Sequence, residues 1–196
     1  MDKLIDEIMG RIFIELEASG RHVHLTEDAA MILFGHPLTA KRPLSQPGQF
    51  VCNERVTVIG EKGRFENVAV LGPERKECQV ELSMTDCVTL GVRAPVRQSG
   101  DTKDTPGIIL QANGKEICLN SGLIVAQRHI HMTPEDAAKR KLTDGQKVKL
   151  RALTARPVIF EDVIVRVSDK FRTYMHLDYD EANACGFCKG DLGMIL

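Results

Sequence analysis

The amino-acid sequence predicts a mainly β protein with short helices, built as two tandem and similar β-barrel domains. Two observations predict this class. The chain repeats itself, because GRHVHLTEDAA at 20–30 recurs as QRHIHMTPEDAA at 127–138, and residues 65–92 align without gaps with residues 160–187. Short alternating apolar segments, separated by Gly, Asn and Asp, occur in both copies and are typical of half-buried strands. A repeat of this length indicates two copies of one structural unit.

Helices and strands are expected in the same order in each copy. A threonine that can cap a helix begins each of two expected helices, Thr26 to Phe34 and Thr133 to Lys141, and acidic residues occupy their first turns. The clearest strand segments are Val56 to Ile59, Val68 to Leu71, Gln79 to Leu82, Val148 to Leu150 and Val163 to Val167. These segments are short and closely spaced, as expected of small barrels.

The domain boundary is expected near the polar stretch RQSGDTKDT at 97–105, which is followed by Pro-Gly and has the composition of a linker. We therefore expect one barrel at 15–105 and a second at 106–196. Ahead of them, residues 1–14 are expected to form a short amphipathic helix, because their apolar residues follow helical spacing with charges between them.

The composition argues against several classes of partner. A net charge of -1, from 26 basic and 27 acidic residues mixed along the chain, does not favour nucleic acid. Because no apolar run approaches the roughly 20 residues that span a bilayer, and no secretory signal is evident, we expect an intracellular protein without a membrane partner. Its six cysteines are then expected as free thiols. Cys185 and Cys188 have redox or metal-ligand spacing, but without a partner pair we interpret them as ordinary structural residues.

Two His-x-His pairs are the first candidate metal ligands. Residues i and i+2 of a strand point to the same face, so His22 with His24, and His129 with His131, can each present two imidazoles to one ion. One such pair is weak evidence, because buried histidines with satisfied hydrogen bonds are common. Both copies of the repeat keep both histidines while the neighbouring residues change, which packing alone does not require.

The second repeated block supplies a third ligand for each pair. It aligns Glu81 with His176, each on an expected strand and each before a helix-like segment. The predicted sites are therefore His22, His24 and Glu81, and His129, His131 and His176. Three protein ligands with one position left open are typical of catalytic zinc, so the sequence predicts two divalent metal ions used in catalysis. His36 has no counterpart in the repeat and is interpreted as a surface residue.

Arginines near these ligands are candidates for a second role. Arg75 lies shortly before Glu81 and can offer a forked cation to phosphate or carboxylate, although a solvated loop charge is an equal alternative. Its counterpart in the repeat is Lys170. Arg21 and Arg128 precede the two His-x-His pairs and are expected on the opposite strand face, either in ion pairs or in support of the ligands.

The chain from about Glu15 to Phe187 resembles the microcompartment-associated phosphate propanoyltransferases, the PduL type of phosphotransacylase. The resemblance rests on RHVHL, LSQPGQF, ENVAVLGPER, QVELS, APVRQSGD, RHIHM and MHLDYDEANA. It implies two β-barrel domains that hold two zinc ions through the six residues named above, with phosphate bound by Arg75. It also implies contacts to coenzyme A from Ala18, Ser19, Gly20, Lys62 and Asn183. Where relatives carry a basic residue in ENVRVLGP, this chain has Ala69, so one expected contact to the coenzyme's phosphates is missing.

By this resemblance the expected reaction converts propanoyl-CoA, or a similar short acyl-CoA, and phosphate into acyl phosphate and coenzyme A at a dinuclear zinc site. The expected location is the lumen of a bacterial microcompartment for propanediol degradation, or otherwise the cytoplasm. Residues 1–13 are expected to contact shell or other cargo proteins, or alternatively to pack on this protein or a subunit interface. A homo-oligomer is left open. Two other functions also remain, a dinuclear metal hydrolase of an ester or thioester and a structural module braced by metal.

Overall fold

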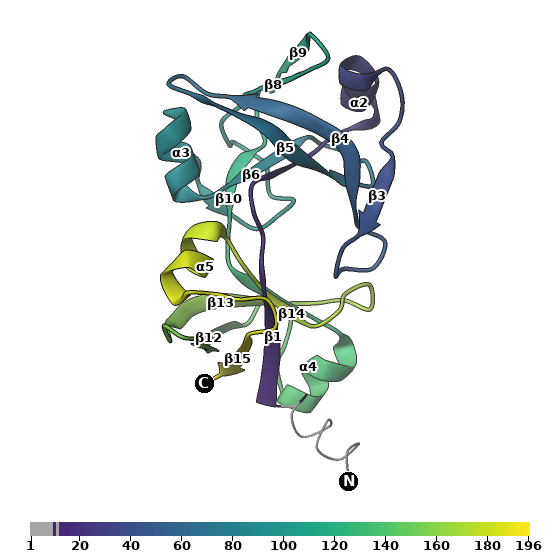
Figure 1. The fold of residues 1–196 in the computed structure, drawn as a ribbon. Coiled ribbons are helices and arrows are strands. Elements are labelled where there is room, and N and C mark those ends of the chain that lie inside the picture. Colours follow the sequence, from purple (N-terminus) through teal and green to yellow (C-terminus); the bar gives the residue numbers. More distant parts are fainter. Residues whose placement is uncertain (1–9, 11) are drawn as a thin grey trace. The chain divides into compact units, whose positions relative to one another are not determined.

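The computed structural model describes Gly10 and residues 12–196. The amphipathic helix predicted at 1–14 therefore lies largely outside the described residues. Short strands and four short helices make up the regular structure of the described part, which confirms the mainly β class. The chain divides into two compact units, drawn in Figure 1. We call them the barrel unit, with described residues up to Ser19 and Gln127–Leu196, and the sheet unit, Gly20–Ala126.

The barrel unit is a closed barrel of six strands. In order around the barrel these are β1 (Phe13–Ala18), β14 (Tyr174–Leu177), β11 (His129–Met132), β13 (Ile159–Val167), β12 (Lys147–Leu153) and β15 (Leu192–Ile195). Helix α4 (Pro134–Arg140) follows β11, and α5 (Tyr179–Cys185) follows β14. Burial alternates residue by residue along β12, so Val148, Leu150 and Ala152 point into the core of the barrel.

The sheet unit contains nine strands and two helices. Its hydrogen-bonded order is β7 (Val96–Arg97), β10 (Leu123–Ala126), β6 (Gln79–Leu82), β2 (His22–His24), β5 (Arg64–Gly72), β4 (Phe50–Ile59), β8 (Ile109–Ala112) and β9 (Lys115–Cys118), with β3 (Ala40–Pro43) paired to β4. The helices are α2 (Glu27–Phe34) and α3 (Met84–Leu90). A separate hydrophobic core, which includes Val23, Val70 and Val80, lies within this unit.

The prediction of two barrels is correct for one unit only. The strand order of the sheet unit runs from β7 to β9, and among the described residues no pairing joins these two end strands. Strands β8 and β9 form a hairpin that extends the sheet at β4. This hairpin has no counterpart in the barrel unit, because it lies outside the two blocks that repeat in the sequence.

The units also do not follow the predicted boundary between residues 105 and 106. Strand β1 belongs to the barrel, where it pairs in parallel with β14, whereas β10 belongs to the sheet unit, where it pairs in parallel with β6. The polar stretch at 97–105 is a loop inside the sheet unit rather than a linker. Thr102 and Thr105 are buried there, and the Thr105 hydroxyl accepts a hydrogen bond from the Gly122 N–H (2.8 Å). Linker-like composition was misleading because buried partners satisfy these polar groups.

Each His-x-His strand has the same neighbours in its own unit. Strand β2 lies between β5, to which it is parallel, and β6, to which it is antiparallel. Strand β11 lies between β13, also parallel, and β14, also antiparallel. The two candidate ligand pairs therefore lie in equivalent local surroundings.

The two helices predicted from threonine caps are confirmed. Thr26 accepts a hydrogen bond from the Ala29 N–H at the start of α2, and Thr133 accepts one from the Asp136 N–H at the start of α4, both at 3.1 Å. Each cap satisfies a backbone donor that the first helical turn leaves without an internal partner. Because each helix follows a His-x-His strand directly, the cap also fixes where that strand ends.

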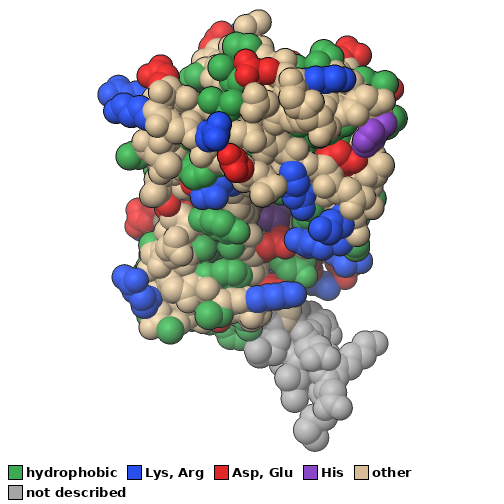
Figure 2. Space-filling view, turned by 45° about the horizontal axis from the view of Figure 1, so that its top comes forward, with side chains coloured by type: hydrophobic (Ala, Val, Ile, Leu, Met, Phe, Trp, Pro, Cys, Tyr) green, Lys and Arg blue, Asp and Glu red, His purple; other side chains and the backbone are tan. Residues whose placement is uncertain are grey.

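The surface shows mixed charge, in keeping with the sequence. Basic and acidic side chains are interspersed over the face drawn in Figure 2. Among the described residues, no helix combines the length and the apolar character needed to cross a membrane.

The barrel core yields a paired prediction on one strand. Leu150 is fully buried, whereas Leu153, three positions along β12, is 40% exposed. Leu150→Ala should lower the free energy of unfolding by about 2–5 kcal/mol, because it leaves a cavity in a packed core. Leu153→Ala should lower it by less than about 1 kcal/mol. Urea denaturation of both variants measures the difference, and equal losses would contradict the assignment of Leu150 to the core.

Candidate metal centres

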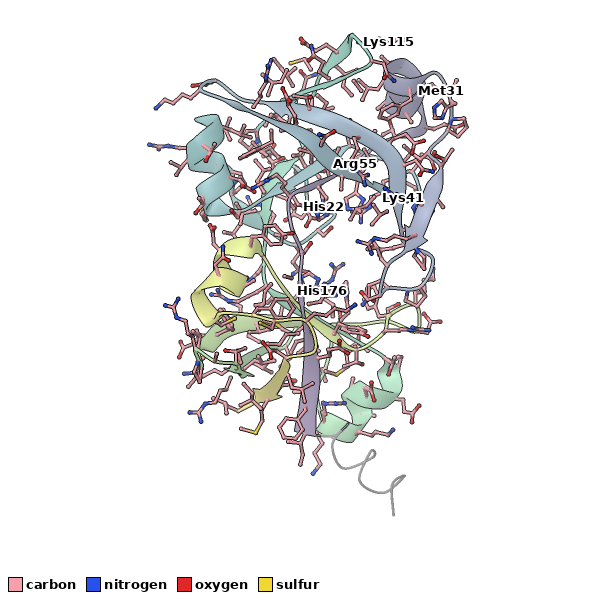
Figure 3. All side chains as sticks on the ribbon, in the orientation of Figure 1. His22, Met31, Lys41, Arg55, Lys115 and His176 are labelled. Carbon is pink, nitrogen blue, oxygen red and sulfur yellow. The ribbon has the colours of Figure 1, made fainter. Side chains whose placement is uncertain are left out.

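The first candidate centre lies in the sheet unit and consists of His22, His24 and Glu81, which we call the sheet cluster. The antiparallel pairing of β2 with β6 places Glu81 directly across from His22. One potential ligand atom from each residue lies within 4.8 Å of the others, and all three residues are buried. Figure 3 labels His22, which lies on β2. The structure thus brings together the three residues that the sequence predicted.

Backbone carbonyls orient both imidazoles of the sheet cluster. His22 Nδ1 lies 2.8 Å from the Gly20 carbonyl oxygen, and His24 Nδ1 lies 3.2 Å from that of Leu71. Since a carbonyl can only accept, each Nδ1 must carry the proton and donate. The Nε2 atoms then face Glu81, at 3.5 Å for His22 and 3.9 Å for His24. This is the tautomer in which Nε2 has a lone pair for a metal ion.

A hydrogen-bond network holds the Glu81 carboxylate. Its Oε1 accepts from Gln79 Nε2 (2.5 Å) and from Ser99 Oγ (2.8 Å), which leaves Oε2 nearest to His22. Arg75 joins the same network, because its Nη1 donates to Ser99 Oγ (3.2 Å). Bonds of this kind fix the direction of a carboxylate that would otherwise rotate.

The pKa values of the three residues in the sheet cluster reflect their burial and the charged groups beside them. Burial lowers the pKa of His22, but the charge and hydrogen bond of Glu81, together with the bond to the Gly20 carbonyl, outweigh burial, so the net shift is upward. Burial, together with His22 and Arg75, places the pKa of His24 well below its ordinary value. Burial would raise the pKa of Glu81, but the two imidazoles and the bond from Ser99 bring it far below its usual range. Glu81 is therefore ionised and His24 neutral, the forms in which each binds a metal.

The second candidate centre lies in the barrel unit and consists of His129, His131 and His176, which we call the barrel cluster. His176, labelled in Figure 3, lies on β14 directly across from His129 on β11, the same register as in the sheet cluster. The potential ligand atoms again lie within 4.8 Å of one another. His129 Nδ1 lies 2.8 Å from the Gln127 carbonyl oxygen and must donate to it, and His131 Nδ1 lies 3.2 Å from His176 Nε2.

Glu17 supports the barrel cluster and was not predicted from the sequence. It lies on β1 across from His176, and its Oε2 is 3.4 Å from His176 Nδ1. A carboxylate at Nδ1 turns Nε2 towards the other two histidines. Gln79 and Ser99 were missed in the sheet unit in the same way. Ser99 lies in a stretch interpreted as a linker. Of these three supporting residues, Gln79 alone could have been found from the sequence, because it lies two residues before Glu81 on an expected strand and so shares its face.

The predicted coenzyme residues fall into both units. Ala18 and Asn183 line one pocket of about 450 Å³ in the barrel unit, together with Tyr179, Ala182, Gly186 and Phe187. Ser19 follows Ala18 and donates its N–H to the Leu177 carbonyl (2.7 Å). In the sheet unit, the Gly20 carbonyl is the acceptor for His22, and Lys62 lies in the turn between β4 and β5.

The remaining candidates lie outside the two clusters. His36 is half exposed, with its Nδ1 2.8 Å from the Pro37 carbonyl oxygen. Cys185 is buried in the barrel core and Cys188 is exposed, and both are free thiols. Lys170, the counterpart of Arg75, is exposed on the barrel unit.

The fold and the clusters define a class of protein: a mainly β chain with two candidate metal centres, each of three ligands, as metal-dependent enzymes use. Residues 15–188 match the family described as "Phosphate propanoyltransferase". The chain therefore belongs to the phosphate propanoyltransferase family, whose members are enzymes that transfer acyl groups.

Three relatives, each named phosphate propanoyltransferase, illustrate the match. The protein from Enterococcus faecalis is 55% identical over 100% of this chain and 97% of its own length. That from Clostridioides difficile is 50% identical, with the same coverage. That from Listeria monocytogenes is 52% identical over 98% of this chain and 93% of its own length. The likeness thus covers both units and both clusters.

Proposed function

We propose that this chain converts propanoyl-CoA, or a similar short acyl-CoA, and phosphate into acyl phosphate and coenzyme A. One observation carries the proposal beyond the family match. Arg75 donates to Ser99, and Ser99 donates to Glu81, so a forked cation is tied to a three-ligand cluster. That arrangement suits an anionic oxygen nucleophile more than water, because a guanidinium binds phosphate through two parallel hydrogen bonds.

We propose that each cluster binds one zinc ion, which makes the chain a two-zinc enzyme. The donor sets fit zinc, because three imidazoles, or two imidazoles and a carboxylate, are ligand sets of catalytic zinc sites. The carbonyl acceptors at Nδ1 and the network around Glu81 also fit, since metal ligands are commonly held by such partners. When bound, zinc would supply a Lewis acid for the thioester carbonyl and a soft acceptor for the departing thiolate.

The residues of the chain then bind and orient the reactants. Arg75 holds phosphate and offsets its charge, and Ser99 fixes the position of the guanidinium. A phosphate oxygen forms a bond to the thioester carbon, the carbon–sulfur bond breaks, and the phosphate's proton passes to the leaving thiolate. We favour this direct attack over an acyl-enzyme, because Nδ1 of His22 and of His24 is already bound to a carbonyl and Nε2 faces Glu81.

We propose that the pocket lined by Ala18 and Asn183 receives part of coenzyme A, with Ser19, Gly20 and Lys62 as further contacts. Ala69 lacks the cation that the resemblance implies at this position. Arg55 lies directly across from it in the pairing of β4 with β5, so a basic side chain is present on the neighbouring strand. Side chains paired in this way lie on the same face of a sheet.

The proposed activity is tested by coenzyme A release from propanoyl-CoA and acetyl-CoA, with and without phosphate. Release should require phosphate, should stop after chelation and should return when zinc is added, because both the nucleophile and the metal are needed. Release without phosphate would indicate a thioester hydrolase instead. If the protein releases no coenzyme A and unfolds when a chelator removes its metal, the result would support the alternative of a structural module braced by metal.

The assignment of the ligands predicts the zinc content of three histidine variants. His22→Ala and His129→Ala should each lower bound zinc from about two to about one ion per chain, because an open site of three ligands does not retain zinc with two. His36→Ala is the matched control, since its side chain lies outside both clusters. Elemental analysis of purified protein measures the content. Loss of zinc in the His36→Ala variant, or none in the other two, would refute the ligand sets.

Arg75→Ala should raise the phosphate KM about tenfold to a hundredfold and lower kcat, because a charge-assisted contact worth about 1.5–3 kcal/mol is lost. Its zinc content should stay at the wild-type value. Arg93→Ala is a control in the same unit, because Arg93 is an exposed arginine. Steady-state kinetics with varied phosphate separate the two variants. An unchanged phosphate dependence in Arg75→Ala would remove the assigned role.

A further inference from the structure

An arginine directly precedes the first histidine of each cluster, and in the sheet unit this is Arg21. Its guanidinium binds both carboxylate oxygens of Asp86, with Nη2 to Oδ1 at 2.7 Å and Nε to Oδ2 at 3.1 Å. Its Cζ also lies 4.0 Å from the centre of the Phe65 ring. Asp86 is buried whereas the Arg21 side chain is 36% exposed, so the fork reaches from a partly exposed cation to a buried carboxylate.

The partners of Arg21 lie on β5, one of the strands that flank the ligand strand β2, and on the helix that follows β6, the other flanking strand. Phe65 belongs to β5, and Asp86 lies in the first turn of α3, which begins directly after β6, the strand of Glu81. Asp86 also closes the capping box of α3, where its side chain accepts from the Ser83 N–H and its own N–H donates to Ser83 Oγ. Arg21 thus connects the strand of two ligands to the end of the strand that carries the third.

The barrel unit contains the same arrangement, built from different residues. Arg128 Nη1 donates to Glu181 Oε1 at 2.5 Å, and Glu181 closes the capping box of α5, directly after the strand of His176. Arg128 Nε donates to the Glu161 carbonyl oxygen on β13 (2.8 Å), and Cζ lies 5.8 Å from the Phe160 ring centre. Arg128 therefore contacts one neighbour of its ligand strand β11, strand β13, and the helix that follows the other neighbour, β14.

The ligand strands are short, so contacts outside the strand can help to hold their register. Strand β2 has three residues, and its register rests on two pairs with β5 and three with β6. A slip of one residue would turn His22 and His24 to the opposite face, because side chains alternate along a strand. Arg21 directly precedes β2, and its fork binds Asp86 rather than a residue of the cluster, so it can oppose a slip without occupying a ligand position.

We propose that Arg21 and Arg128 are positioning residues that fix the register of the metal-ligand strands, each for the cluster in its own unit. The inference rests on the proposed metal centres and adds residues that touch neither metal nor substrate. An ion pair that only stabilises its unit would change the free energy of unfolding and leave the zinc affinity of folded protein as it is. We call a residue that fixes the register of a ligand strand a register clamp. Loss of a register clamp changes the zinc affinity of the cluster in its own unit and not that of the other cluster.

The test uses two backgrounds that each retain one centre, His131→Ala for the sheet cluster and His24→Ala for the barrel cluster. In the His131→Ala background, Arg21→Met should weaken zinc binding about tenfold in competition with a chelator, and Arg128→Met should leave it unchanged. In the His24→Ala background, Arg128→Met should weaken zinc binding and Arg21→Met should leave it unchanged. Each arginine variant is thus the matched control for the other, and urea unfolding of the same proteins records stability separately.

Arg21→Met leaves Asp86 buried without its cation and can prevent folding. The double variant Arg21→Met with Asp86→Asn removes the stranded charge, and Arg21→Lys retains the charge without the fork. Both should still weaken the zinc of the sheet cluster, Arg21→Lys by the smaller factor. Unchanged zinc affinity in all three folded variants, or equal weakening of both clusters by either arginine variant, would overturn the clamp. Wild-type protein that binds no zinc would overturn the metal centres and, with them, the clamp.

Discussion

The cross-strand pairing of each His-x-His strand with its antiparallel neighbour is the constraint on which both centres depend. It places His22 opposite Glu81 and His129 opposite His176, so the third candidate ligand of each cluster is fixed by backbone hydrogen bonds rather than by a loop. Because period two sends alternate residues to one face, three ligands converge from only two short strands. The helix after each third-ligand strand then begins at a capping box, which ends that strand at a defined residue.

Burying these polar groups requires that each has a partner. In the sheet unit, Gln79 and Ser99 satisfy one oxygen of Glu81, and the Gly100 N–H donates to the side-chain Oε1 of Gln79 (2.7 Å). The loop that carries Ser99 is largely exposed, but Ser99 itself is half-buried and its hydroxyl belongs to this network. In the barrel unit, the corresponding support comes from Glu17 on β1.

Much of the site could be predicted from the sequence, and less of the fold. The clustering of the six candidate ligands could be predicted because the chain offers each pattern twice, and the two threonine caps because capping is local. Strand β1 joins the barrel unit and β10 joins the sheet unit, each across the predicted boundary. Neither assignment could be predicted, because parallel pairing with β14 or β6 has no signature within the sequence of the strand itself. Glu17 and Ser99 were missed for the same reason, since each reaches its cluster only through such long-range packing. The internal repeat itself stays a prediction.

The difference between the two ligand sets has an electrostatic consequence for the proposed reaction. A divalent ion held by three neutral imidazoles would keep a formal charge of +2, whereas one held by two imidazoles and Glu81 would keep +1. Arg75, tied through Ser99 to that carboxylate, returns one positive charge to the sheet cluster. Both centres would then offer similar attraction to anionic reactants, although only one contains a carboxylate. If Glu81 is a ligand as proposed, the guanidinium would offset its charge, and the barrel cluster, which has no carboxylate among its three residues, would not call for such a cation.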